Sequence, residues 1–122
     1  MLNLEPKRDG SWEKLKEPFK SKVHLLFLRM RLRGFDPIIF EGLRSEKRQK
    51  WLYGYGRTHH KGQRPKTWTL RGEHMRGLAI DVISKKHWWN SDLFYIALHV
   101  EANKLGLHYL RQEQCHIQLK EP

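Results

Sequence analysis

Two histidines, one aspartate and one glutamate are the residues whose types and spacing could do chemistry together. His74 begins the stretch His-Met-Arg-Gly-Leu-Ala-Ile-Asp, which ends at Asp81, and Glu113 precedes His116 in Glu-Gln-Cys-His. Two imidazoles and one carboxylate leave the fourth position of a tetrahedral zinc ion open for water, as in catalytic zinc sites. A carboxylate beside that water can take its proton. We therefore expect His74, Asp81 and His116 to bind Zn²⁺ and Glu113 to act as the base.

A turn followed by a strand must lie between the first two ligands. In one continuous helix His74 and Asp81 would be separated by about 10.5 Å along the axis, too far to share an ion. In a central strand that follows a turn at Arg76 and Gly77, Ala79 and Asp81 lie on one face. The small residues before Asp81 predict an open hollow in front of its carboxylate. The opposite, core face is formed by Leu78, Ile80 and Val82.

The last predicted strand begins at His116 and places Ile117 and Leu119 in the core. Glu113 is expected in the preceding turn, close to the ion without binding it. Cys115 would point away from His116 as a small buried thiol. The other histidines have no convincing ligand spacing, and we interpret them as structural or solvent-facing: His24, His59, His60, His87, His99 and His108.

The remaining elements are helices and short strands without βαβ alternation. Helices are expected from Pro18 to about Gly34, from a cap at Ser45 to Tyr53, and from a cap at Asn90 or Ser91 to Gly106. A short buried strand is predicted over residues 38–40 and another over residues 67–70. The fold class is α+β, a small, mainly antiparallel sheet flanked by helices. Residues expected to face inward are Trp51 and Leu52 in the second helix and Leu93, Ile96, Ala97, Val100 and Leu105 in the third.

Length and charge limit the function classes. The chain has 122 residues, which predicts a single domain over residues 1–122 with a loose lead-in over residues 1–17. Its formal net charge is +11, which favours a polyanionic partner such as nucleic acid, an anionic membrane face or an anionic wall polymer. The basic residues between Gly42 and Gly72 could equally be a solvated face that keeps the protein soluble. The single cysteine allows no internal disulfide.

Targeting signals are not apparent in the sequence. Residues 1–10 are polar and lack the apolar segment of a signal peptide, and the longest apolar run, residues 25–28, is too short to span a bilayer. We expect synthesis in a cytoplasm without an export route of its own.

The site motifs resemble those of a known family. His-x-x-Gly-x-Ala-x-Asp followed by Glu-x-x-His is similar to the zinc D-Ala-D-Ala carboxypeptidase and L-alanyl-D-glutamate endopeptidase family, which cleaves the stem peptides of bacterial peptidoglycan. The likeness extends upstream through residues 41–45, Arg48-Gln49, Leu52-Tyr53 and residues 56–58. It covers roughly residues 18 to 119, nearly the whole chain. It implies the fold that this family shares with the hedgehog signalling domain.

The resemblance also assigns residues. It implies His74, Asp81 and His116 as ligands and Glu113 as base. Arg44 corresponds to the arginine that faces the polarised peptide carbonyl, a catalytic and substrate-binding residue, and Gln49 and Thr69 are also expected to bind substrate. Two features depart from the family pattern. Gly72 replaces a serine that hydrogen-bonds near the first ligand, and the loop before Glu113 is shortened to residues 108–112.

The leading hypothesis is a phage endolysin of the L-alanyl-D-glutamate endopeptidase type, a monomer stored in the host cytoplasm and acting on the wall after lysis. Its basic surface would suit anionic envelope polymers or lipids, without an obligate nucleic acid. A D-alanyl-D-alanine carboxypeptidase or dipeptidase is an alternative. Two other classes are a basic nucleic-acid-binding protein or metal-dependent nuclease, favoured by the charge and by His59-His60, and a wall-binding protein that has lost catalysis.

Overall fold

The computed structural model describes residues 4–64, 72–110 and 113–120. Its centre is a four-stranded sheet in the order β1-β2-β4-β3, in which every neighbouring pair is antiparallel. The α+β architecture with a small antiparallel sheet is thereby confirmed. The bounds of the strands are β1 Pro37–Glu41, β2 Ala79–Ser84, β3 Leu107–Leu110 and β4 Glu113–Leu119.

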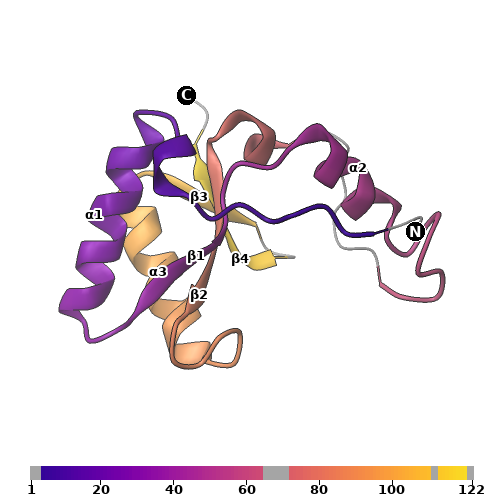
Figure 1. The fold of residues 1–122 in the computed structure, drawn as a ribbon. Helices are drawn as coiled ribbons and strands as arrows, with labels where there is room; N and C mark the ends of the chain where they lie inside the picture. The colour runs from indigo at the N-terminus through magenta and orange to yellow at the C-terminus, as the bar shows by residue number, and fades with distance from the viewer. Residues whose placement is uncertain (1–3, 65–71, 111–112, 121–122) are drawn as a thin grey trace.

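Two helices cover one face of this sheet. α1 (Phe19–Leu32) and α3 (Asp92–Lys104) lie side by side there, whereas α2 (Glu46–Gly54) lies on the other side of the sheet (Figure 1). The core between helices and sheet is built from buried side chains at helical spacing on α1 and α3 and from alternate residues of the strands. Its members include Phe19, Val23, Leu26, Met30, Ile80, Val82, Phe94, Leu98 and Ile117.

The predicted helix starts and stops agree with the structure. Ser45 caps α2 by accepting a hydrogen bond from the Arg48 amide, and Ser91 caps α3 by accepting one from the Phe94 amide. α1 ends before Gly34, which adopts a left-handed φ of 91°. The central position of β2, between β1 and β4, is also as predicted.

The predicted inner stripe of the third helix is correct for Ala97 and for Leu105, which packs against the core, and wrong for the other three residues. Leu93, Ile96 and Val100 are exposed on α3, because the helix turns a different side to the sheet. The side chains that it buries are Phe94, Tyr95, Ala97, Leu98, Glu101 and Ala102. Spacing alone could not separate these two stripes, since both repeat with helical period.

Three further predictions need correction, and one cannot be compared. The strand over residues 38–40 is not fully buried, because β1 is at the sheet edge and Ile38 is 37% exposed. Trp51 is only partly buried, whereas Leu52 faces inward as expected. β4 begins at Glu113, three residues before the predicted start. The strand predicted over residues 67–70 lies outside the described residues.

The N-terminal segment is held against the rest of the chain from Glu5 onward, where Glu5 and the carbonyl of Pro6 bind Arg48. The carbonyl of Asp9 accepts a hydrogen bond from the Gly42 amide, at 2.7 Å, and the Lys16 amide donates to Gly77. Leu15 is buried, and Trp12 stacks on His24 with ring centroids 4.2 Å apart. This segment is therefore packed against the fold and does not form the loose lead-in expected from the sequence.

Within the described residues, no helix combines the length and apolarity that a bilayer crossing requires.

Candidate metal centre

Asp81 and His116 lie opposite each other on two adjacent central strands. They are register partners in the antiparallel pair of β2 and β4, one position after the core pair Ile80 and Ile117. Because side chains alternate along a strand, Asp81 and His116 point to the sheet face opposite the one covered by α1 and α3. The sheet therefore fixes two of the predicted ligands by backbone pairing alone.

His74 reaches the same site from a short 3-10 helix, η2 (Glu73–Arg76), immediately before β2. The turn that redirects the chain is at Gly77, where φ is 72°, a left-handed conformation that favours glycine. The predicted turn at Arg76 and Gly77 is confirmed. His74 is 4% exposed, so the turn delivers its imidazole to a buried position.

Gly77 and Ala79 do not form the open hollow in front of Asp81 that was predicted from their small size. Ala79 is fully buried, and a Cβ atom added to Gly77 would lie 2.8 Å from the carbonyl oxygen of Lys14. The small residue at position 77 is thus required by the close approach of the N-terminal segment, and it does not make room for a substrate.

The three predicted ligands converge to the distances that one metal ion requires. Their ligand atoms all lie within 4.8 Å of one another. His74 Nε2 is 3.3 Å from Asp81 Oδ1, and His116 Nδ1 is 3.6 Å from the same oxygen. Ligands about 2.0–2.1 Å from a tetrahedral zinc ion are about 3.3–3.4 Å apart, so the donor set fits such an ion.

Each histidine is oriented by a hydrogen bond from its other ring nitrogen. His74 Nδ1 lies 2.8 Å from the carbonyl oxygen of Gly42, and since a carbonyl only accepts, Nδ1 donates and Nε2 is the nitrogen that faces Asp81. His116 Nε2 donates to the side-chain oxygen of Gln118, also at 2.8 Å, which directs Nδ1 toward Asp81. Such bonds orient each ring so that its other nitrogen can bind a metal. Gly72 has no side chain to offer His74, and the bond that orients His74 is made to the carbonyl of Gly42.

Glu113 lies next to the ligand set. Its Oε2 is 3.6 Å from His116 Nδ1, and its side chain is 28% exposed. Burial raises the pKa of the Glu113 carboxyl, and the negative charge of Asp81 raises it further. A carboxylate with a raised pKa is a better proton acceptor. The position and chemistry of Glu113 fit a base beside the ion.

The charge distribution also favours a cation in this place. Burial alone would raise the pKa of Asp81, but the charge of His74 and hydrogen bonds from both histidines hold that pKa well below its usual range. Burial alone would lower the pKa of His116, but the hydrogen bond and charge of Asp81, with the contact to Gln118 and the charge of Glu113, together raise it. Asp81 is therefore ionised, and it stabilises positive charge among the ligands.

Arg44 is held at the edge of the site by a buried cluster. Its guanidinium donates to Glu41 and to the side-chain oxygen of Gln49, each at 2.9 Å, and Nη2 is 3.5 Å from Asp81 Oδ2. Glu41 is also paired with Arg48, which in turn binds Glu5. Gln49, expected to bind substrate, is 1% exposed. The Nε atom of Arg44 is buried without a partner among the described residues.

A cavity of about 300 Å³ leads from the surface to this cluster. Its lining includes Arg44 and Asp81, together with Arg8 and Phe40. The Arg8 guanidinium lies over the Phe40 ring, 3.7 Å from its centroid. The site is consequently accessible from the side where the N-terminal segment crosses β1.

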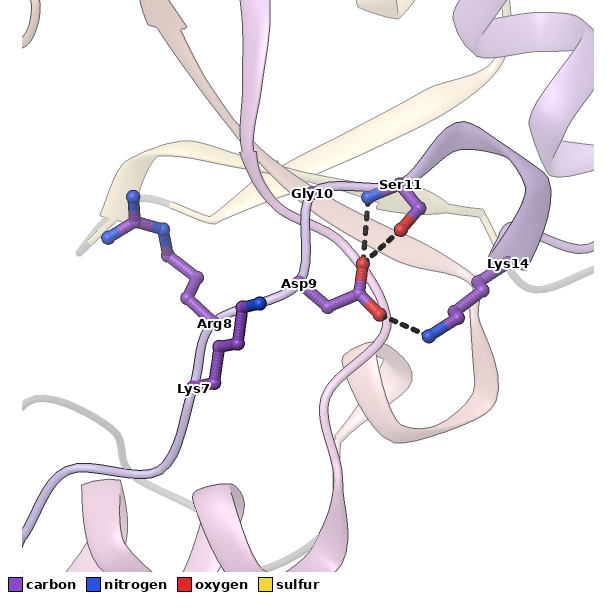
Figure 2. Close-up of a pocket in the computed structure, with 6 residues that line it drawn as sticks. All are labelled: Lys7, Arg8, Asp9, Gly10, Ser11 and Lys14. Carbon is purple, nitrogen blue, oxygen red and sulfur yellow. Dashed lines mark hydrogen bonds and ion pairs between the residues drawn. The ribbon is translucent and has the colours of Figure 1, made fainter.

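A second hollow, of about 480 Å³, lies farther along the N-terminal segment. Figure 2 shows Ser11 and Lys14 converging on the carboxylate of Asp9, while Arg8 extends to the other side. Lys14 Nζ is 2.7 Å from Asp9, and this contact and those with Ser11 lower the pKa of Asp9 to about 2. Asp9 is the only acidic residue that lines this hollow, and it is paired with Lys14, so the hollow offers no ligand set for a metal.

The histidine pair His59-His60 and Cys115 lie outside the proposed ligand set. His59 is buried against Trp51, whose carbonyl lies 2.8 Å from its Nε2, and His60 stacks on Tyr55. These two histidines belong to an aromatic cluster apart from the metal ligands. Cys115 is partly buried against the core, as expected. Thr69 lies outside the described residues, as do residues 111–112 of the shortened loop.

Four contributors to the site escaped sequence reasoning: Glu41, Gly42, Arg48 and Gln118. Glu41 could have been suspected as a charged end of an otherwise apolar strand, and Gln118 because it shares a strand face with His116. The role of Gly42 is carried by its backbone carbonyl, which leaves no signal in residue type.

Comparison with solved structures identifies the fold of this chain. No protein-family model and no curated protein sequence matches the chain. Among solved structures, VanYB in complex with D-alanine-D-alanine superposes with a TM-score of 0.69 at 17% identity, covering 99% of this chain and 81% of that one. This chain has the VanY fold. At such identity the likeness establishes the architecture alone.

Two other structures share the VanY fold. A mutant of the vancomycin resistance D,D-pentapeptidase VanY in complex with Zn(II) has a TM-score of 0.67 at 19% identity, with 88% of this chain and 73% of that chain covered. The L-Ala D-Glu endopeptidase ChiX of Serratia marcescens has a TM-score of 0.53 at 21% identity, with 89% and 83% covered.

Proposed function

We propose that this chain is a zinc-dependent peptidase that hydrolyses peptide bonds in the stem peptides of bacterial peptidoglycan. The observation that carries the proposal is the convergence of His74, Asp81 and His116, with Glu113 beside them, on one face of a VanY-type sheet. The fold is shared with proteins described as D,D-pentapeptidase and L-Ala D-Glu endopeptidase, one of them in complex with Zn(II).

Zinc would be held by His74 Nε2, Asp81 and His116 Nδ1. When bound, it lowers the pKa of a coordinated water to about 7 and polarises the substrate carbonyl. The protein contributes ligands whose rings are oriented in advance by Gly42 and Gln118. A metal site that needs no rearrangement of its ligands binds more tightly.

Glu113 would take the proton from the attacking water and return it to the leaving amine. It is close enough to the ligands to contact such a water, and its carboxylate is not needed to complete the three-ligand set. Its partial exposure leaves room for a substrate on its open side. Removal of a general base typically slows an enzyme by about 10² to 10⁴.

Arg44 would stabilise the negative charge that develops on the carbonyl oxygen, or hold a substrate carboxylate. Its guanidinium is fixed by Glu41 and Gln49, so little reorganisation is needed during the reaction. The Nε atom of Arg44 has no acceptor among the described residues, and a substrate oxygen would supply one. We assign Gln49 the positioning of Arg44, since its side chain is buried behind the guanidinium. The substrate contact proposed for Thr69 rests on the sequence resemblance alone.

Two alternatives remain for the bond that is cleaved. The sequence favours the hypothesis of an L-alanyl-D-glutamate endopeptidase of phage endolysin type, released from the host cytoplasm at lysis. The ChiX-like fold and the net charge of +11, which suits an anionic envelope, support it. A D-alanyl-D-alanine carboxypeptidase has equal support, because VanYB with D-alanine-D-alanine shares the fold.

Digestion of purified peptidoglycan, with mass spectrometry of the products, tests this proposal. The endopeptidase predicts fragments with a newly exposed D-glutamate amine, whereas the carboxypeptidase predicts release of D-alanine. The Glu113→Gln variant, purified with zinc and checked for metal content, is the control and should release neither. Absence of any new peptide terminus with the zinc-loaded protein would reject both forms.

A further inference from the structure

α1 and α3 carry apolar side chains on the sides that point away from the sheet. They are Leu25, Leu28 and Leu32 on α1 and Leu93, Ile96 and Val100 on α3, between 43% and 78% exposed. In both helices the three residues follow the spacing i, i+3, i+7, so each set forms a row along one side. We name the six residues together the outer helical face.

The two rows belong to one surface because the helices are antiparallel neighbours. Lys22 near the start of α1 donates to the carbonyl of Leu105 just after α3, and Phe35 just after α1 packs against Phe94 near the start of α3, with ring centroids 5.9 Å apart. α1 and α3 also lie side by side in Figure 1. The seam between the helices is bridged by the ion pairs of Arg29 and Arg33 with Glu101, so the two apolar rows flank a charged seam. Single exposed apolar residues are ordinary, but two rows of them on one side of a protein indicate an interaction site.

One tryptophan, Trp88, lies in the turn at one end of this surface. Trp88, between β2 and α3, is 54% exposed, whereas its neighbour Trp89 packs against Phe40, a residue of the cavity at the metal site, with ring centroids 4.7 Å apart. Asp36, which follows α1, accepts hydrogen bonds from Ser84 and Lys86, so this turn lies at the end of the face formed by Leu32 and Leu93. Tryptophan is enriched where proteins meet the headgroup layer of a membrane.

The charges around the outer helical face are mainly positive. The acid at its centre, Glu101, is buried and already paired with Arg29, Arg33 and Lys104. Among the acids, Asp36 and Asp92 also lie near this surface. The exposed cations beside it include Arg31, Arg33, Lys85, Lys86 and Lys104. Leucines bordered by arginine and lysine are typical of helices that lie in the interface of an anionic bilayer.

A second copy of the chain fits this surface less well. Two molecules that each carry a net charge of +11 repel one another, and pairing through this face would bring its cations together. An anionic lipid surface complements both the apolar rows and the surrounding charge.

We propose that the outer helical face is a peripheral docking surface for an anionic lipid bilayer. α1 and α3 would lie in the headgroup plane with the leucine, isoleucine, valine and Trp88 side chains inserted. Since Asp81 and His116 are on the opposite face of the sheet, the metal centre would be directed away from the bilayer. This proposal does not depend on the peptidase function, because bilayer binding is measured without a substrate.

Co-sedimentation with unilamellar vesicles at about 0.1 M salt tests the apolar rows. We expect the protein to bind vesicles of equal parts phosphatidylglycerol and phosphatidylcholine, and to bind phosphatidylcholine alone far more weakly. Replacing Leu28→Ser and Ile96→Ser together should weaken binding at least about tenfold, since buried apolar area is lost. Both positions are exposed, so circular dichroism should remain that of the wild-type protein.

A charge-matched pair of variants separates this surface from net charge alone. Arg31→Glu with Lys86→Glu should weaken binding more than about tenfold, because each basic residue near the bilayer contributes about fivefold. Lys47→Glu with Lys50→Glu, on α2 across the sheet, makes the same change in net charge and should have a much smaller effect.

Three results would overturn the proposal. The first is failure of the wild-type protein to bind the anionic vesicles. The second is equal weakening by the two charge-reversed pairs, which would indicate attraction without a specific surface. The third is a dimer, detected by sedimentation velocity, that the Leu28→Ser and Ile96→Ser variant dissociates while its vesicle binding is unchanged.

Discussion

Asp81 and His116 are cross-strand partners in the pair of β2 and β4, and Asp81 Oδ1 lies 3.6 Å from His116 Nδ1. The adjacent pair, Ile80 and Ile117, is fully buried in the core on the other face. The same register that closes the core therefore sets two of the proposed metal ligands against each other. A one-residue slip would bury Asp81 and His116 and expose the isoleucines, so core packing enforces the geometry of the site.

The hydrogen bond from His116 to Gln118 should contribute to zinc affinity without being essential to it. We expect Gln118→Ala to weaken zinc binding about 10- to 100-fold, since the imidazole loses the partner that orients it. His116→Ala removes a ligand and should abolish stoichiometric binding. Competition with a chromogenic zinc chelator measures both. Equal affinity of Gln118→Ala and the wild-type protein would show that this contact does not support the site.

The buried carboxylate of Glu41 should be required for stability. Glu41→Gln leaves Arg44 and Arg48 without their shared counter-charge, and removing one partner of a buried ion pair costs about 3–5 kcal/mol. Glu46→Gln on α2, where the carboxylate pairs with Lys50 in solvent, should cost about 0.5 kcal/mol or less. Urea unfolding gives both free energies. Similar losses for the two variants would contradict the proposed role of the cluster.

Asp9 should make stability depend on acid pH. Its pKa is about 2 in the folded protein, against an ordinary value of 3.8, chiefly because of Lys14. A depressed folded pKa stabilises the protein above the unfolded pKa, and that contribution is lost as pH falls from about 4 to about 2. We expect the wild-type protein to lose about 1 kcal/mol more than Asp9→Asn over this window, after allowance for solvent screening. Parallel pH profiles of unfolding free energy would refute the assignment.

Substitutions at two leucines of α3 test which side of this helix faces the sheet. Leu98 is fully buried in the core, so Leu98→Ala should cost about 2–5 kcal/mol. Leu93 is 72% exposed, so Leu93→Ala should cost no more than about 0.5 kcal/mol. Thermal or urea unfolding measures the difference. A larger loss at Leu93 than at Leu98 would restore the helix orientation first expected from the sequence.

The convergence of His74, Asp81 and His116 was predictable because its geometry follows from local rules. Gly77 marks a turn, the alternation after it separates Asp81 from Ile80, and His116 precedes apolar residues in a strand pattern. These signals are short-range and depend on residue type. The caps at Ser45 and Ser91 were predictable for the same reason, since a hydroxyl at a helix start satisfies free backbone amides.

The features that sequence reasoning missed depend on contacts between distant segments. The orientation of α3 is decided by packing against α1 and the sheet, and two helical stripes of similar hydrophobicity compete for the core. Gly77 is small because Lys14 passes over it, a contact across more than sixty positions of sequence. The partners of the site histidines, Gly42 and Gln118, are likewise known only once the chain is folded.

The central claim is metal-dependent hydrolysis at the site formed by His74, Asp81, His116 and Glu113. Its most direct test is the release of new amine termini from purified peptidoglycan by one preparation, assayed as purified, after complete metal removal, and after addition of one equivalent of Zn²⁺. We predict activity in the first state, none in the second and full recovery in the third. Hydrolysis that persists in the metal-free protein would contradict this account.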